Sequence, residues 1–197
     1  MITNGADARL NECEAEETTA VARVFSRNDR ANWNGIPTTY RGIRMRSRAE
    51  ARFAAFMDRV KWTWSYEPTD LNGYIPDFIV DGDRELLIEI KSDAEDFAVA
   101  EYKIESSGWD GEALIVASRL DGPVLGRLWS VGNGPREWSQ AQLFRCISCG
   151  SVSVLSAELS WHCRMCGVGG GNGHVGEYDP QSDWVEACNR VQWRAAK

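Results

Sequence analysis

Residues 74–91, YIPDFIVDGDRELLIEIK, decide the fold that this chain is expected to adopt. Two apolar runs flank the Asp-Gly-Asp sequence at 81–83, a pattern typical of two strands joined by a hairpin turn. Pairing of these strands brings Asp77 in the first strand close to Glu89 in the second. Two like charges at such a separation are costly unless a cation lies between them. The hairpin therefore predicts a binding site for a divalent cation.

Lys91 completes the chemistry that this hairpin suggests. Side chains alternate between the two faces of a strand, so Glu89 and Lys91 point to one face while the apolar residues beside them point to the other. Two carboxylates that hold Mg²⁺ or Mn²⁺ and one ammonium are the minimum equipment for metal-assisted phosphodiester hydrolysis. The residues alone leave two alternatives open. Glu89 and Lys91 also suit a weak salt bridge on a solvated edge, and Asp77 also suits a turn.

The pattern around the hairpin predicts a mixed α/β domain with helices packed on a central sheet. A different unit follows, and residues 1–38 are expected to form a partly disordered arm. The expected division is an arm at 1–38, a first domain at 39–142, and a small unit with a final helix at 143–197. The elements expected in the first domain are strands at 40–45, 62–66, 74–80, 85–91 and 113–117 and helices at 47–60 and 94–106.

Glu50 is a fourth candidate for the cation site. It stands near the start of the predicted helix, from which it would point across the sheet toward Asp77 and Glu89. A structural alternative explains it equally well, because Ser47 and Glu50 have the spacing of a capping box. In that arrangement, Ser47 caps the helix and the Glu50 carboxylate accepts from the Ser47 amide.

Four ordered segments resemble the PD-(D/E)xK nuclease superfamily, and in particular small nuclease-like proteins carried by phages and plasmids. The segments are RSRAEARFA at 46–54, WSYEP at 64–68, YIPDF at 74–78 and IEIK at 88–91. The resemblance covers about residues 39–118 and implies a restriction-endonuclease-like core of helix, mixed sheet and helix. Phe53 stands where these proteins usually have tryptophan.

The same resemblance implies a role for each candidate residue. Asp77 and Glu89 would bind the metal, Lys91 would act in catalysis, and Glu50 would be an accessory acid. We expect the backbone carbonyl of Ile90 to complete the Mg²⁺ or Mn²⁺ site, because hard cations prefer oxygen ligands.

Charge and composition are compatible with a nucleic-acid partner, and DNA is the expected one. The chain carries a net charge of −7, yet residues 39–60 contain six arginines against Glu50 and Asp58. A basic strip beside an acidic metal site suits a polyanion that is cut with the help of a cation. Cutting both strands would require two active sites and hence a homodimer. The arginines expected to contact nucleic acid are Arg44, Arg46, Arg48 and Arg52.

Two Cys-x-x-Cys pairs, thirteen residues apart, predict a zinc site in the second unit. Four thiolates on two tight turns complete a tetrahedral Zn²⁺ shell, as in a zinc ribbon, and such a closed site is structural. Two unrelated cysteine pairs are the alternative, and His162 could replace one ligand. Arg145 and Arg164 flank the pairs, where they would suit a nucleic acid. The four expected ligands are Cys146, Cys149, Cys163 and Cys166.

The leading functional hypothesis is thus a metal-dependent endonuclease with an appended zinc ribbon. A catalytically silent module, which keeps the nuclease scaffold to bind a nucleic acid or a protein, is the alternative from a different class. We expect no membrane segment, because no apolar run approaches about 18 residues. A cytoplasmic protein is expected, within a bacterial host if the gene is carried by a phage.

Overall fold

The computed structural model describes residues 35–120, 124–130, 136–156, 162–170 and 175–192. The arm predicted at 1–38 lies outside these residues except for its last four positions. Residues Gly35–Lys197 form one compact unit. The division expected at 142/143 stays a prediction. Within the described ranges, no helix is long and apolar enough to cross a membrane.

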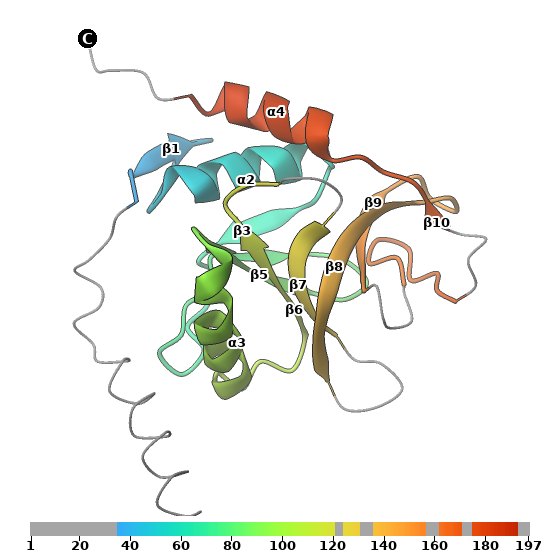
Figure 1. Cartoon of the computed structure of the whole chain (residues 1–197), viewed down its shortest axis with the longest axis horizontal. Coiled ribbons are helices and arrows are strands. Elements are labelled where there is room, and N and C mark those ends of the chain that lie inside the picture. The colour runs from blue at the N-terminus through green and yellow to red at the C-terminus, as the bar shows by residue number, and fades with distance from the viewer. Residues whose placement is uncertain (1–34, 121–123, 131–135, 157–161, 171–174, 193–197) are drawn as a thin grey trace, which may run out of the picture. The chain divides into compact units, whose positions relative to one another are not determined.

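An eight-stranded sheet forms the centre of this unit, and the predicted mixed α/β class is confirmed (Figure 1). Seven strands follow the order β10-β8-β7-β6-β5-β4-β3, and β9 pairs with β8. The β5–β6 pair is parallel and the other pairs are antiparallel. The strands are β3 (Trp64–Tyr66), β4 (Phe78–Val80), β5 (Leu86–Lys91), β6 (Glu112–Ala117), β7 (Val124–Ser130), β8 (Glu137–Cys146), β9 (Val152–Ser156) and β10 (Val175–Gly176).

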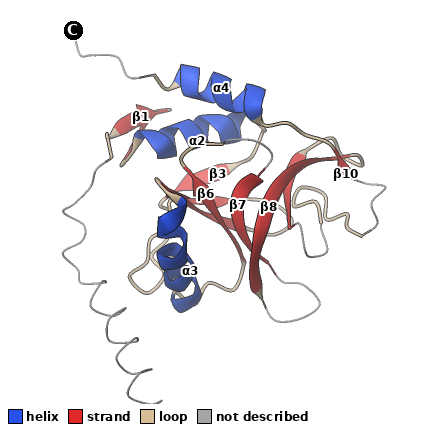
Figure 2. Cartoon of the chain, in the orientation of Figure 1, coloured by secondary structure: helices blue, strands red, loops and turns tan. Residues whose placement is uncertain are grey.

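Helix α2 (Arg48–Arg59) packs on one face of this sheet, together with α4 (Gln181–Arg190) (Figure 2). The Ser47 hydroxyl accepts from the Glu50 amide and begins α2, as predicted. Large apolar side chains repeat on the inner face of α2, and Phe53 and Phe56 both contact the ring of Trp184 from α4. The final helix of the chain therefore helps to close the main core.

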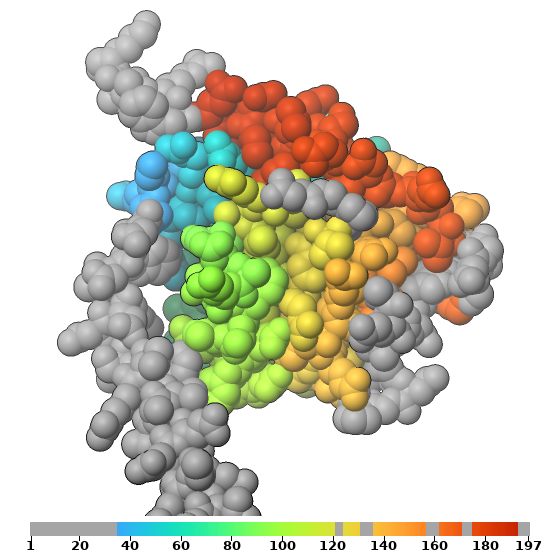
Figure 3. Space-filling view, in the orientation of Figure 1, coloured from blue at the N-terminus to red at the C-terminus, as the bar shows by residue number. Residues whose placement is uncertain are grey.

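Helix α3 (Phe97–Ser106) covers part of the opposite face, after a short 3₁₀ turn at Ala94–Asp96. Its Ala100 and Ile104 pack against Leu87 of β5 and Ile115 of β6. On the face seen in Figure 3, α3 leaves the surfaces of β7 and β8 beside it uncovered. Alternate residues of β5 face opposite sides of the sheet: Leu87 packs with α3, whereas Leu86 and Ile88 belong to the core under α2.

Two local predictions differ from the structure. Residues 40–45 are not one strand but a small hairpin of β1 (Thr38–Tyr40) and β2 (Ile43–Met45). Arg41 and Gly42 both have positive φ, which turns the chain there. The strand expected from residue 74 begins only at Phe78, because Tyr74 instead closes a turn by pairing with Leu71.

Candidate functional site

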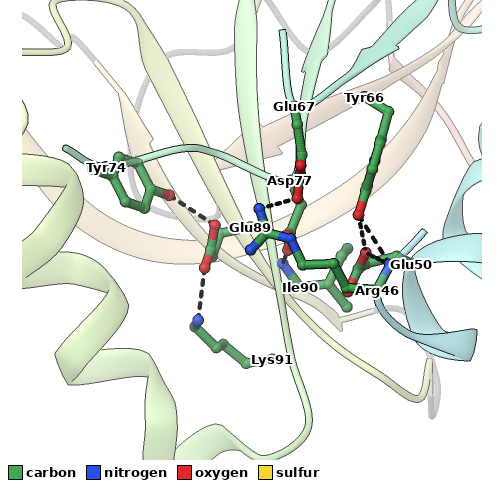
Figure 4. Close-up of polar contacts among 9 residues, drawn as sticks. All are labelled: Arg46, Glu50, Tyr66, Glu67, Tyr74, Asp77, Glu89, Ile90 and Lys91. Carbon is green, nitrogen blue, oxygen red and sulfur yellow. Dashed lines mark hydrogen bonds and ion pairs between the residues drawn. The ribbon is translucent and has the colours of Figure 1, made fainter. Parts of the chain in front are cut away.

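Asp77 and Glu89 face each other across the β4–β5 hairpin, and only 7% of each residue is exposed. Phe78 pairs with Ile88 in the antiparallel register, which places the preceding Asp77 opposite Glu89. The Ile90 amide donates to Asp77 Oδ2 at 2.7 Å and fixes this carboxylate against β5 (Figure 4). The structure therefore brings together the two acids that sequence reasoning paired.

Both oxygens of Glu89 have a donor. Lys91 Nζ lies 2.6 Å from Glu89 Oε1, and the Tyr74 hydroxyl donates to Glu89 Oε2 at 2.8 Å (Figure 4). Burial lowers the pKa of Lys91, but the charge and hydrogen bond of Glu89 outweigh this effect and leave the pKa above its usual value. Lys91 is therefore an ammonium that lies directly beside the acids.

The arrangement disfavours the charged form of the Asp77 carboxylate. Burial raises its pKa well above the usual value, and the charges of Glu89 and Glu50 raise it further. The Ile90 amide and Lys91 oppose this shift without cancelling it. A buried site with excess negative charge and oxygen donors fits a hard divalent cation such as Mg²⁺ or Mn²⁺, which would offset the repulsion.

Glu50 is buried at the start of α2 and makes a different capping contact from the predicted one. Its carboxylate accepts from the Tyr66 hydroxyl at 2.7 Å and from the amide of Arg46 at 3.0 Å, rather than from the amide of Ser47 (Figure 4). It is still close enough to Asp77 to raise the pKa of that residue. Glu50 thus lies near Asp77, and its Oε2 already accepts two hydrogen bonds.

The three acids do not form a compact ligand set by themselves. Across the part of the chain that the structure describes, the cysteines are the one group of three or more potential ligands with donor atoms within 4.8 Å of one another. Asp77, Glu89 and Glu50 are thus not all within that distance of one another, and the Asp77–Glu89 pair remains the candidate for a cation.

The arginines of the basic strip do not share one environment. Arg46 forms an ion pair with Glu67, and Arg44 is exposed on β2. Arg48 and Arg52 are partly buried on α2, where Arg52 Nε is a buried donor with no hydrogen-bond partner among the described residues. The strip is thus partly neutralised, and Arg44 is the most accessible of the four arginines expected to contact nucleic acid.

The four cysteines come together as predicted. The sulfurs of Cys146 and Cys166 are 3.9 Å apart, and those of Cys149 and Cys163 are 3.6 Å apart. A tetrahedron with metal–sulfur distances of about 2.3 Å has edges of about 3.8 Å, so the spacing fits one Zn²⁺ ion. The cluster could hold a metal such as zinc.

Two matching turns place these sulfurs. Gly150 N donates to the Cys146 carbonyl at 2.7 Å, and Gly167 N donates to the Cys163 carbonyl at 2.8 Å. Both glycines have φ near +70°, a conformation that side chains disfavour. Each Cys-x-x-Cys segment is thus a tight knuckle closed by the glycine that follows it.

Arg164, inside the second knuckle, is buried rather than available to a nucleic acid. Its guanidinium lies 2.7 Å from Glu112 Oε2, and both side chains are at most 7% exposed. His162 Nε2 also faces Glu112, at 3.5 Å, while the four sulfurs already make up the cluster. The knuckle is therefore attached to the start of β6 by a buried ion pair.

The same knuckle touches the tip of the β4–β5 hairpin. Asp83 N donates to the Arg164 carbonyl at 2.5 Å, and a Cβ added at Gly82 would lie 2.5 Å from that oxygen. Gly82 is therefore required by the close approach of the knuckle and not only by the turn.

Replacing Gly82 with alanine is expected to lower the free energy of unfolding by about 1–3 kcal/mol, because the added methyl group overpacks this contact. Thermal unfolding of the zinc-loaded protein measures the change. Asp81→Ala, in the same turn but exposed, is the matched control. Equal stability of the two variants would show that the hairpin does not depend on the knuckle.

Tyr66 and Tyr74 were not predicted to take part in the site. Tyr66 donates its hydroxyl to Glu50, and Tyr74 donates its hydroxyl to Glu89. The signal in the sequence is weak: Tyr66 directly precedes Glu67, and Tyr74 stands three residues before Asp77.

Comparisons with protein-family models, curated proteins and solved structures give no match for this chain.

Proposed function

We propose that this protein is a metal-dependent nuclease that hydrolyses phosphodiester bonds of nucleic acid, with DNA as the substrate. The observation that carries the proposal is the convergence of buried Asp77 and Glu89 with the Lys91 ammonium at one end of the hairpin. Asp77, Glu89 and the Ile90 carbonyl would hold Mg²⁺ or Mn²⁺. Such an ion lowers the pKa of a bound water and polarises the scissile phosphate.

The side chains have separate tasks in this proposal. Asp77 and Glu89 supply negative oxygen donors on a rigid hairpin, where the Ile90 amide prevents Asp77 from rotating away. Lys91 offsets the negative charge that develops on the phosphate in the transition state. Glu50 adds negative charge beside Asp77 and acts as an accessory acid.

The surroundings of the site are compatible with a restriction-endonuclease-like core. A helix that begins beside the acids, a mixed sheet and a helix on the other face follow in that order along the chain. We propose that Arg44, Arg48 and Arg52 contact the phosphate backbone, because these arginines lie on β2 and α2 near Glu50. The four cysteines would hold Zn²⁺ as a structural ion.

A catalytically silent binding module is the second candidate. Two observations favour it: Lys91 is already paired with Glu89, and Arg46 is already paired with Glu67. In both pairs, a basic side chain expected to meet the substrate is already neutralised by a carboxylate.

Incubation with linear, circular, single-stranded and branched DNA and with RNA, in Mg²⁺, Mn²⁺ or EDTA, tests the proposal. We expect cleavage of at least one DNA substrate with Mg²⁺ or Mn²⁺ and none in EDTA. A folded, zinc-loaded protein that cuts no member of the panel would favour the silent module. Its affinity for each substrate would then be measured by fluorescence anisotropy.

A further inference from the structure

Tyr74 is the residue whose contact with the acidic pair has no role in the proposed reaction. Its hydroxyl donates to Glu89 Oε2 at 2.8 Å, on the side of the carboxylate opposite to Lys91, which bonds Oε1. The two donors therefore hold Glu89 from both ends (Figure 4). Without the tyrosine hydroxyl, the lysine would be the remaining described donor to this carboxylate.

The turn before Tyr74 is built to hold it in place. Asn72 and Gly73 both have positive φ, and the amides of Leu71 and Tyr74 donate to each other's carbonyls at 2.7 and 3.1 Å. The side chain of Asn72 also donates to the carbonyl of Ser107 at the end of α3. These contacts fix the turn against α3 and so fix the tyrosine ring.

The ring of Tyr74 packs against the small core that Leu87 of β5 forms with α3 and β6. The hydroxyl is thus presented to Glu89 by a rigid backbone and a packed ring. Neither χ angle can change without disturbing that packing, so the hydrogen bond restricts the rotation of the carboxylate. Outer hydrogen bonds of this kind orient metal-binding side chains and tune their affinity.

We propose that Tyr74 is a positioning residue that orients the Glu89 carboxylate for a divalent cation. This inference rests on the proposed function of the Asp77–Glu89 pair. Loss of the hydroxyl leaves Glu89 free to rotate toward Lys91, and the oxygen donors then no longer converge on one point. The cation would have to order the carboxylate as it binds, which weakens binding without changing the chemical step.

The test is a titration of the zinc-loaded full chain with Mn²⁺, followed by electron paramagnetic resonance of the free ion. Tyr74→Phe keeps the packed ring and removes only the hydroxyl, and we expect its Kd for Mn²⁺ to rise roughly ten- to a hundred-fold. Tyr178→Phe is the matched control, because it removes a similar hydroxyl bond to a carboxylate, that of Asp183. Its Kd should equal that of the unchanged protein.

Cleavage assays add a readout that a general loss of structure would not produce. At saturating Mn²⁺, Tyr74→Phe should regain a kcat within a few-fold of the unchanged protein, since only the affinity for the cation is weakened. A Kd unchanged by Tyr74→Phe would overturn the positioning role alone. An unchanged protein that binds Mn²⁺ no better than Asp77→Asn would overturn both this role and the proposed function.

Discussion

Replacing Asp77 with asparagine is expected to abolish metal-dependent cleavage and, in the same protein, to raise thermal stability when no Mg²⁺ or Mn²⁺ is present. The variant loses a negative ligand from the proposed cation site, and metal ions contribute several kcal/mol of transition-state stabilisation. Because each 1.4 kcal/mol is about a tenfold change in rate, the loss should be roughly a thousand-fold or more. Initial rates on the preferred DNA substrate measure it.

The gain in stability follows from the burial of Asp77. Its pKa is raised by burial and by the charges of Glu89 and Glu50, so the folded protein holds this proton more tightly than the unfolded chain does. Stability of the metal-free protein should then fall as the pH rises above about 4, the usual value for an aspartate, toward the raised pKa of the folded state. Asparagine keeps an oxygen for the Ile90 amide and carries no charge, so it escapes this loss.

Thermal unfolding of the zinc-loaded protein without Mg²⁺ or Mn²⁺, across this pH range, checks the prediction. The melting temperature of Asp77→Asn should exceed that of the unchanged protein by several degrees near neutral pH, and the gap should shrink on acidification. Adding Mn²⁺ should stabilise only the unchanged protein, which would close the gap. A variant that is less stable than the unchanged protein at every pH would mean that Asp77 has a structural role instead.

The hairpin was predictable because the residues that define its strands and its turn all lie within one short segment, residues 74–91. The two apolar runs and the turn residues between them predict the hairpin, whereas the register that places Asp77 opposite Glu89 depends on a five-residue loop at 81–85. The helix beginning at Ser47 was equally local, since its cap and its apolar face lie within one segment. Sequence reasoning therefore found the elements that carry the proposed site.

The contacts that complete the site depend on distant parts of the chain. Arg164 looked like a surface residue because it stands between two cysteines, yet its partner Glu112 is 52 positions earlier, and the pair is buried. The role of Tyr74 depends on a turn that shortens the predicted strand, which periodicity does not reveal. Such contacts arise when the sheet and the knuckles pack together.

Strands β7 and β8 were not predicted, because they too depend on contacts between distant parts of the chain. Their facing residues include Trp129 and Trp138, whose rings stack at 5.8 Å, and Arg127, which bonds Glu101 of α3. The polar side chains on the half-covered face interrupt the apolar run that would mark a buried strand. Long-range pairing, rather than local pattern, defines these two strands.

Removing the metal from the four-cysteine cluster is expected to be the most destabilising change to this protein. Freshly purified protein should contain one Zn²⁺ per chain by elemental analysis. Structural zinc contributes on the order of 10 kcal/mol, which is comparable to the stability of a whole domain. Cys163→Ala, at a buried ligand, should therefore lose the ion and most of its cooperative thermal transition. Cys188→Ala, on α4 and outside the cluster, should keep both.

Loss of zinc should also loosen the β4–β5 hairpin that carries Asp77 and Glu89, because the second knuckle contacts the tip of this hairpin. The carbonyl of Arg164 accepts from Asp83, and its guanidinium pairs with Glu112 at the start of β6. When the knuckle loosens, the tip of the β4–β5 hairpin loses both its hydrogen bond and its packing partner. When zinc is removed stepwise from the otherwise unchanged protein, hydrogen exchange at Asp83 should accelerate before exchange in α2, which packs on α4. Equal protection of the hairpin with and without zinc would mean that the acidic pair is independent of the cysteine cluster.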